Sequence, residues 1–247
     1  NPAITLAVGL VVTTLLPLMA LPEGETRLRR VFLLGSAAAV VLAVVAALLV
    51  PPYSEDSPQP VNLYYAVDGD TGQARWMSVP YDDVTPPPLR QKFGPDAEVA
   101  FPWSEVRYLA IEAENIDAAA PMLEIVSEEP SGAARVVTAR LRSPRQADAM
   151  DLVLSRAQLE GLTVAGRPLS VSDGPGGEYY FLSCYGRGCD GLEVRVQVAG
   201  EASIDGWVVD YSLGLPSAAA PLLEARPATA VPVQEGDLTM VWAAVEF

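Results

Sequence analysis

Two long runs of apolar residues constrain this chain more than any other feature of its sequence. Residues 4–21 (ITLAVGLVVTTLLPLMAL) and 31–50 (VFLLGSAAAVVLAVVAALLV) contain no charged side chain. At a rise of about 1.5 Å per residue, a helix over either run would extend roughly 27–30 Å, the thickness of a bilayer's hydrocarbon core. The alternatives are a signal-peptide core for the first run and a buried soluble helix for the second. We expect two transmembrane helices.

The short segment between the two runs determines their expected orientation. Residues 22–30 (PEGETRLRR) contain Arg27, Arg29 and Arg30. Positively charged loops stay on the cytoplasmic side, so these arginines predict a helical hairpin with the rest of the chain outside the cytoplasm. The bias toward arginine, alanine and valine suggests a bacterium of high genomic GC content. We therefore expect an integral protein of the bacterial inner membrane, in contact with the lipid bilayer, with residues 61–247 on the periplasmic or extracellular side.

Composition excludes several classes of function. The formal net charge of the 247 residues is −15, and an acidic surface repels phosphate backbones, so we expect no nucleic-acid partner. The chain has no histidine, which removes the commonest general base and the commonest zinc ligand. It has no G-x-S-x-G motif, and no pair of carboxylates stands out among its 31 acidic residues. The sequence predicts no catalytic residue and no metal ligand in this chain.

Beyond a polar, proline-bearing linker at residues 51–60, the pattern changes to the alternation of apolar and polar residues that is typical of half-buried strands. Short strands punctuated by glycine and proline favour an antiparallel β-sandwich over residues 61–247. Residues 89–93 favour a short helical turn, and residues 218–232 have no clear assignment. The expected strands are 61–67, 74–79, 106–113, 122–127, 134–142, 149–154, 159–164, 178–184, 192–198, 206–211 and 238–247.

Several short motifs have both a functional and a structural interpretation. The string DGDTG at residues 68–72 resembles the start of a calcium loop, but Val79 stands where an EF-hand needs glutamate, so a hairpin turn is favoured. Asp82 and Asp83 are interpreted as a solvated acidic loop rather than a weak cation site. The glycine-rich DGPGGEYY precedes a strand, which argues against a phosphate cradle. The four tryptophans are expected in the core, with a carbohydrate platform as the alternative for one of them: Trp76, Trp103, Trp207 and Trp242.

The two cysteines lie close together in SCYGRGCDG, where the glycines permit a tight loop. Outside the cytoplasm, Cys184 and Cys189 would pair, so we expect a disulfide. Two unpaired thiols are the first alternative. A metal site is a poorer one, because two cysteines without histidine or a second pair make an incomplete ligand set.

Several strings resemble the C-terminal region of membrane-bound zinc aminopeptidase-like proteins, the endoplasmic-reticulum metallopeptidase (Fxna-type) group and its bacterial relatives. They are NLYYAVDGDTGQARWMSV, FGPDAEVAFPWSEVRYLA, ARLRSPRQADAMDLVL, LTVAGRPL, GLEVRVQVAG, GWVVDYSLGLP and DLTMVWAAVEF. The resemblance covers most of residues 45–247. It implies an upstream di-zinc exopeptidase domain, further transmembrane helices and a β-rich C-terminal domain. None of the family's zinc-ligand or general-base motifs is in this chain, so no catalytic residue is transferred.

The resemblance makes this chain the non-catalytic membrane anchor and accessory region of a zinc-dependent aminopeptidase, with zinc held by the upstream domain. The start at Asn1, directly before an apolar run, agrees with a fragment of a longer protein. Two other interpretations remain open. One is a free-standing, membrane-tethered binding or sensor domain that engages a protein or a glycan. The other is an accessory subunit of a membrane complex.

Overall fold

A computed structural model describes residue 9 and residues 26–49, 51–80, 84–94, 98–171, 177–200 and 203–246. The chain divides into two compact units, Asn1–Ser57 and Pro58–Phe247.

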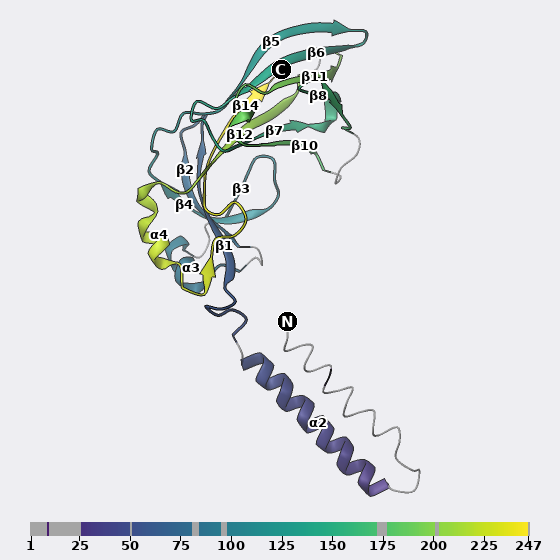
Figure 1. Cartoon of the computed structure of the whole chain (residues 1–247), viewed down its shortest axis with the longest axis vertical. Coiled ribbons are helices and arrows are strands. Elements are labelled where there is room, and N and C mark those ends of the chain that lie inside the picture. Colours follow the sequence, from purple (N-terminus) through teal and green to yellow (C-terminus); the bar gives the residue numbers. More distant parts are fainter. Residues whose placement is uncertain are drawn as a thin grey trace. The chain divides into compact units, whose positions relative to one another are not determined.

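The first unit contains one described helix, α2 (Thr26–Leu49), drawn in purple in Figure 1. It begins in the arginine-bearing segment and includes the backbone of Arg27, Arg29 and Arg30. Many of its large apolar side chains are exposed, among them Leu34 and Leu48. Apart from Gly9, the first apolar run lies outside the described residues.

The predicted transmembrane hairpin is wrong, and with it the predicted location in a bacterial inner membrane. Within the described part of the chain, none of the helices combines the length and the apolar character needed to cross a bilayer. The predicted orientation is wrong as well, because it required the arginines to lie in a loop between two spans. They lie instead within a helix that starts at Thr26, five residues before the uncharged run.

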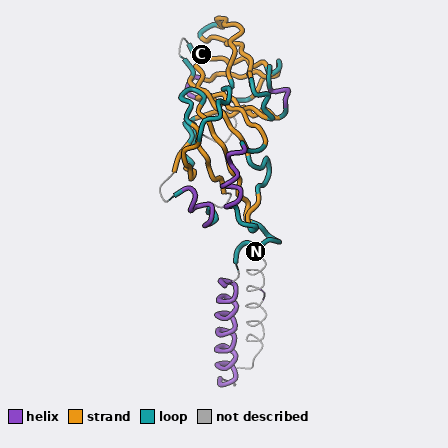
Figure 2. The backbone as a smooth tube through the Cα atoms, turned by 90° about the vertical axis from the view of Figure 1, so that its left-hand side faces the viewer, coloured by secondary structure: helices purple, strands orange, loops and turns teal. Residues whose placement is uncertain are grey.

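The second unit is built from two sheets, whose strands appear in orange in Figure 2. The larger sheet has nine described strands and the smaller one has five. In spatial order the larger sheet contains β10 (Tyr179–Tyr185), β7 (Ala149–Ser155), β12 (Asp205–Leu213), β14 (Leu238–Glu246), β1 (Gln59–Asp68), β2 (Ala74–Pro80), β4 (Arg107–Ala113) and β3 (Glu98–Ala100), with β13 (Ala230–Val231) beside β1. The smaller sheet contains β5 (Met122–Ser131), β6 (Ala134–Arg142), β11 (Glu193–Ala199), β8 (Leu159–Val164) and β9 (Arg167–Leu169).

The β-rich character of this unit is confirmed, but the larger sheet is mixed rather than antiparallel. Strand β1 runs parallel to both β14 and β13, with Tyr64 opposite Leu238 and Gln59 opposite Ala230. The first and last long strands of the unit are therefore neighbours in the middle of the sheet. Local alternation marks a strand without identifying its partner, so the sequence pattern did not indicate this pairing.

One face of the larger sheet is covered by two different partners. At the β10–β7–β12 end, Leu152 and Val208 pack with Val137 and Val196 of the smaller sheet. At the β1–β2–β4 end, the cover consists of two short helices, α3 (Pro87–Phe93) and α4 (Ala220–Ala225), seen at the lower left of the unit in Figure 1. Three single 3-10 turns complete the described elements: η1 (Arg156–Gln158), η2 (Arg187–Cys189) and η3 (Ser217–Ala219).

Residues 214–237, which carry η3, α4 and β13, are joined to strand β1 by side-chain hydrogen bonds. The buried Asn62 amide donates to the Val233 carbonyl and accepts from the Val233 N–H, at 3.1 and 2.9 Å. The Asp237 carboxylate accepts from the Leu63 N–H and pairs with Arg226 at 2.6 Å. These bonds order the alanine- and proline-rich segment that the sequence pattern left without an assignment.

Candidate functional site: an aromatic pocket on the second face of the larger sheet

The second face of the larger sheet has its own aromatic cluster, separate from the two cores just described. The alternation along β12 explains how it arises. Val208 points to the covered face, whereas Trp207, Val209 and Tyr211 belong to the second face. The sheet register places Val209 opposite Trp242 of β14, and Tyr211 opposite Met240. The alternation along β12 therefore places successive side chains on opposite faces, and the two rings lie on the second face.

A loop between β3 and β4 supplies the outer layer of this cluster. Phe101 and Trp103 stack on each other at 5.3 Å, with their planes within 6°. Trp103 also lies 5.5 Å from Trp207 and 6.1 Å from Trp242, ring centre to ring centre. The loop is ordered by its own backbone, because the Ser104 N–H donates to the Phe101 carbonyl at 3.0 Å. The proline-rich segment is thus held against the sheet by its aromatic rings.

The loop and the sheet line an open pocket of about 720 Å³, which we call the aromatic pocket. This volume is in the range of small-molecule sites. Seven aromatic residues line it: Tyr64, Phe101, Trp103, Tyr108, Tyr179, Phe181 and Tyr211. Glu105 and Glu178, both exposed, are its charged lining residues. Phe181 is 49% exposed, so part of the apolar lining is open to solvent.

Two smaller pockets adjoin the aromatic pocket and share residues with it. The acidic pocket, of about 390 Å³, shares Tyr64 and Tyr211. The end pocket, of about 550 Å³, shares Glu178 and Tyr179. The acidic pocket is also lined by Asp148, Asp151 and Glu235, and the end pocket by Asp205 and Glu246. Within the described part of the chain, no arginine or lysine lines any of the three.

Tyr211 and Asp151 form the polar centre of this surface. The Tyr211 hydroxyl donates to Asp151 Oδ2 at 2.7 Å, from β12 to the neighbouring β7. Burial raises the pKa of the Asp151 carboxyl, the hydrogen bonds from Ser183 and Tyr211 oppose this rise, and the charge of Glu235 adds to it. Burial, followed by the charge of Asp151, raises the pKa of the Tyr211 phenol well above its usual 10.0. Tyr211 therefore stays neutral and remains a hydrogen-bond donor at physiological pH.

A second buried carboxylate, that of Asp210, is bonded to partners within the fold. It is inaccessible to solvent, accepts from the Ser143 hydroxyl at 2.7 Å and pairs with Arg145 at 2.5 Å. The Ser143 hydroxyl in turn accepts from the Ala147 N–H. Because its lone pairs face partners within the protein, Asp210 is a structural residue and not part of the candidate site.

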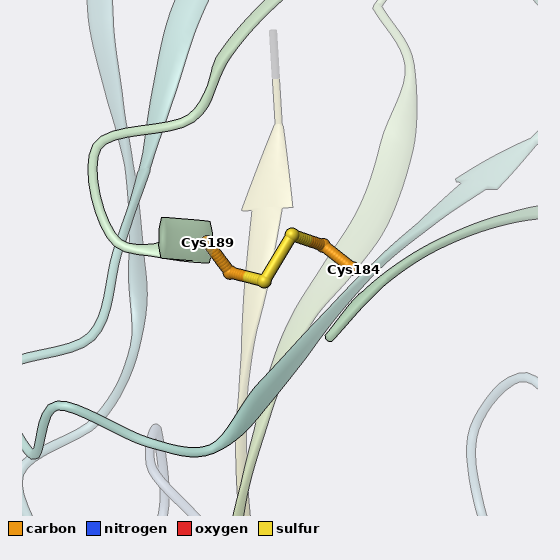
Figure 3. Close-up of a disulfide and its surroundings, with 2 residues drawn as sticks. All are labelled: Cys184 and Cys189. Atoms are coloured by element: carbon orange, nitrogen blue, oxygen red, sulfur yellow. A yellow bond between two sulfur atoms is a disulfide. The ribbon is translucent and has the colours of Figure 1, made fainter. Parts of the chain in front are cut away.

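The predicted disulfide is confirmed. Cys184 and Cys189 are bonded, with their Cα atoms 5.7 Å apart (Figure 3), and the bond joins strand β10 to the short turn η2. The Gly186 N–H within this loop donates to the Asp148 carbonyl at 2.7 Å. Tyr185, between these residues, is 73% exposed and lines the acidic pocket. The disulfide loop therefore borders the candidate site.

The DGDTG string forms the predicted hairpin turn between β1 and β2. Asp68 Oδ1 accepts from the N–H groups of Asp70 and Thr71, and Asp70 Oδ2 accepts from the Ala244 N–H at 2.7 Å. These carboxylates thus bond to the backbone. Asp82 and Asp83 lie outside the described residues, as does most of the DGPGG string. Among the described residues, no group of three or more potential ligands is arranged to hold a metal ion.

The tryptophans divide between the two faces of the larger sheet. Trp76 belongs to the covered face, where its ring lies 4.8 Å from that of Tyr65. Trp103, Trp207 and Trp242 meet in the aromatic cluster on the second face. The alternation around each tryptophan predicts a buried ring but does not indicate that three of the rings meet. The only signal for the site was FPWSE, an aromatic pair within a proline-rich stretch.

No protein-family model matches this chain, and neither does any curated protein. The resemblance to zinc aminopeptidase-like proteins therefore stays a prediction, together with the zinc that it implies for an upstream domain.

Proposed function

We propose that Pro58–Phe247 is a non-catalytic ligand-binding domain, and that the aromatic pocket is its binding site. The observation that carries the proposal is the gathering of seven aromatic residues around a 720 Å³ pocket on a sheet face that neither the smaller sheet nor the two helices cover. Partly exposed aromatic surface is costly to leave in water, and large patches of it mark binding sites on folded proteins.

The chemistry of the lining supports binding rather than catalysis. The aromatic pocket offers ring faces and two rim carboxylates, Glu105 and Glu178, both exposed. The Asp151 carboxylate in the adjoining pocket accepts hydrogen bonds from Tyr211 and Ser183. These groups can stack, attract charge and orient a ligand. The proposal corresponds to the binding-domain interpretation of the sequence, without its membrane tether. An accessory role beside a zinc peptidase rests on the resemblance alone and stays a prediction.

The test is a binding experiment with probes of different charge on purified Pro58–Phe247 and on the whole chain. We expect at least one of choline, cellopentaose or benzoate to change the tryptophan fluorescence of both in a saturable way. Phe181→Ala should weaken that binding at least fivefold, because Phe181 lines the pocket. Since this side chain is 49% exposed, its truncation should leave the fold intact.

The matched control is Leu223→Ala, on helix α4 at the covered face. Leu223 is similarly exposed, at 43%, and lines none of the three pockets. The control should bind like the natural protein. The proposal fails if all three probes leave the fluorescence unchanged, or if Phe181→Ala and Leu223→Ala affect binding equally.

A further inference from the structure

The charged residues that line the three adjoining pockets are all acidic, which indicates the charge of the ligand. Their linings contain seven carboxylates and, within the described residues, no basic side chain. The two carboxylates that line the aromatic pocket, those of Glu105 and Glu178, are exposed at its rim. The net charge of the chain is −15, so the wider field has the same sign. An anionic ligand would meet repulsion at every wall of this surface.

We propose that the aromatic pocket binds an organic cation that carries a quaternary or otherwise alkylated ammonium group. This inference rests on the proposed binding function and specifies its ligand. The face of an aromatic ring carries negative electrostatic potential, so several rings around one pocket attract a cation. The rim carboxylates add to the attraction in the same direction. A pocket of about 720 Å³ is large enough for a ligand that extends beyond its ammonium group.

The ring faces of the pocket favour an alkylated over a primary ammonium group. A primary ammonium has three N–H donors that each need an acceptor when water is removed. Besides the tyrosine hydroxyls and Ser104, the lining presents ring faces and apolar groups, such as those of Phe101, Trp103 and Met240. A quaternary ammonium has no N–H group to satisfy and presents methyl groups to the rings. Its charge can then act on Glu105 and Glu178 at the rim.

The protein already uses the same interaction within its own fold. The guanidinium carbon of Arg156 lies 5.3 Å from the ring centre of Tyr180. Tyr180 alternates along β10 with Tyr179 and Phe181, which line the aromatic pocket on the second face. On the covered face, Tyr180 of β10 thus contacts the Arg156 cation of the protein itself. On the second face its two neighbours line a pocket that has no basic side chain among the described residues, which leaves their rings for a cation from outside.

The experiment compares choline with 3,3-dimethylbutan-1-ol, a neutral molecule of nearly the same shape, by calorimetric titration of the whole chain. We expect choline to bind at least fivefold more tightly, because only the charge differs. Raising the salt concentration should weaken choline binding and leave the alcohol unaffected. Replacing both rim carboxylates, in Glu105→Gln with Glu178→Gln, should reduce the preference for choline at least threefold. Glu224→Gln, an exposed residue of α4, should not change it.

The outcomes separate this inference from the proposed function. If choline and 3,3-dimethylbutan-1-ol bind equally, the inference of a cationic ligand is wrong and the binding function stands. The same holds if only benzoate or cellopentaose binds, and if that binding depends on Phe181. If choline binds but the rim variants retain the full preference, the assignment to this pocket is overturned. If no probe binds at all, both the proposed function and the cation fail.

Discussion

The Tyr211 hydroxyl lies 2.7 Å from Asp151 Oδ2 and joins strands β12 and β7 at a wall of the acidic pocket. Tyr211 also lines the aromatic pocket, so the same side chain supports two adjoining parts of the candidate site. The carboxylate is held in a partly dry environment, which raises its pKa above the ordinary value of 3.8. The protonation state of Asp151 therefore affects both the charge of the site and the stability of the sheet.

The raised pKa of Asp151 predicts a pH-dependent effect of Asp151→Asn. A native carboxyl that holds its proton more tightly than in the unfolded chain contributes stability that is fully present below the ordinary pKa of 3.8. That contribution is lost as the pH rises through the native pKa. We therefore expect the melting temperature of Asp151→Asn to exceed that of the natural protein at pH 7, with a gap that narrows as the pH falls toward 4.

Removing any negative charge from this acidic chain could raise its stability, so the control is Glu224→Gln, also a change of one charge. The measurement is the melting temperature of all three proteins across the pH range. A gap for Asp151→Asn that equals that of Glu224→Gln at every pH contradicts the prediction.

The buried pair of Asp210 and Arg145 should contribute far more to stability than a surface pair. Asp210 is inaccessible to solvent, and its removal leaves Arg145, whose side chain is 15% exposed, without its counterion. We expect Asp210→Ala to lower the free energy of unfolding by about 3–5 kcal/mol. Glu124→Ala breaks a pair with Arg142 of 2.8 Å, but those side chains are 48% and 39% exposed, so the loss should stay below about 1 kcal/mol. Urea denaturation of both variants tests this, and equal losses would show that Asp210 is not buried as described.

Gly206 occupies a position of close contact between β12 and β7. A Cβ atom there would lie 2.3 Å from the Val153 carbonyl oxygen and 3.1 Å from a methyl carbon of Leu154. Because the nearest atom belongs to the backbone, the strands must shift apart to accept it. Gly206→Ala should therefore cost about 1–3 kcal/mol of unfolding free energy. Gly188→Ala is the control, since an added Cβ meets no atom within 4 Å, and similar stability of the two variants would contradict the register of these strands.

The disulfide should contribute modest stability, because Cys184 and Cys189 close a loop of only a few residues. In the chain-entropy account, closing such a loop raises the free energy of unfolding by about 2 kcal/mol. We expect the double variant Cys184→Ala with Cys189→Ala to unfold at a lower urea concentration than the oxidised protein. Added reductant should move the natural protein toward the variant and leave the variant unchanged. Identical midpoints for the oxidised protein and the variant would contradict this role.

Much of the local structure follows from the alternation of residues. Residues 134–142 and 159–164 coincide with β6 and β8, and the expected turn after residue 67 joins β1 to β2. What alternation lacks is the identity of the neighbouring strand. The parallel contact of β1 with β14 joins residues about 170 positions apart, and the short strands β3, β9 and β13 carry too few residues to show a period.

The sequence did not predict the candidate site either, because alternation does not identify the neighbouring strand. Trp207 and Trp242 become neighbours only because β12 pairs with β14, and Trp103 reaches them from a loop whose proline content suggested irregular structure. The membrane prediction failed differently. It depended on counting uncharged residues and treating the arginines as a loop, whereas helix α2 begins at Thr26 and includes them.

The most direct test of the central claim, that the aromatic pocket binds an organic cation, is to follow the four indole N–H signals by NMR during a choline titration. Trp103 lines the pocket, and the ring of Trp207 packs against that of Trp103. Trp76 belongs to the covered face and serves as an internal control. We expect the Trp103 and Trp207 signals to shift in a saturable way while the Trp76 signal stays in place. Signals that do not move, or a Trp76 signal that moves as much as that of Trp103, would contradict the account.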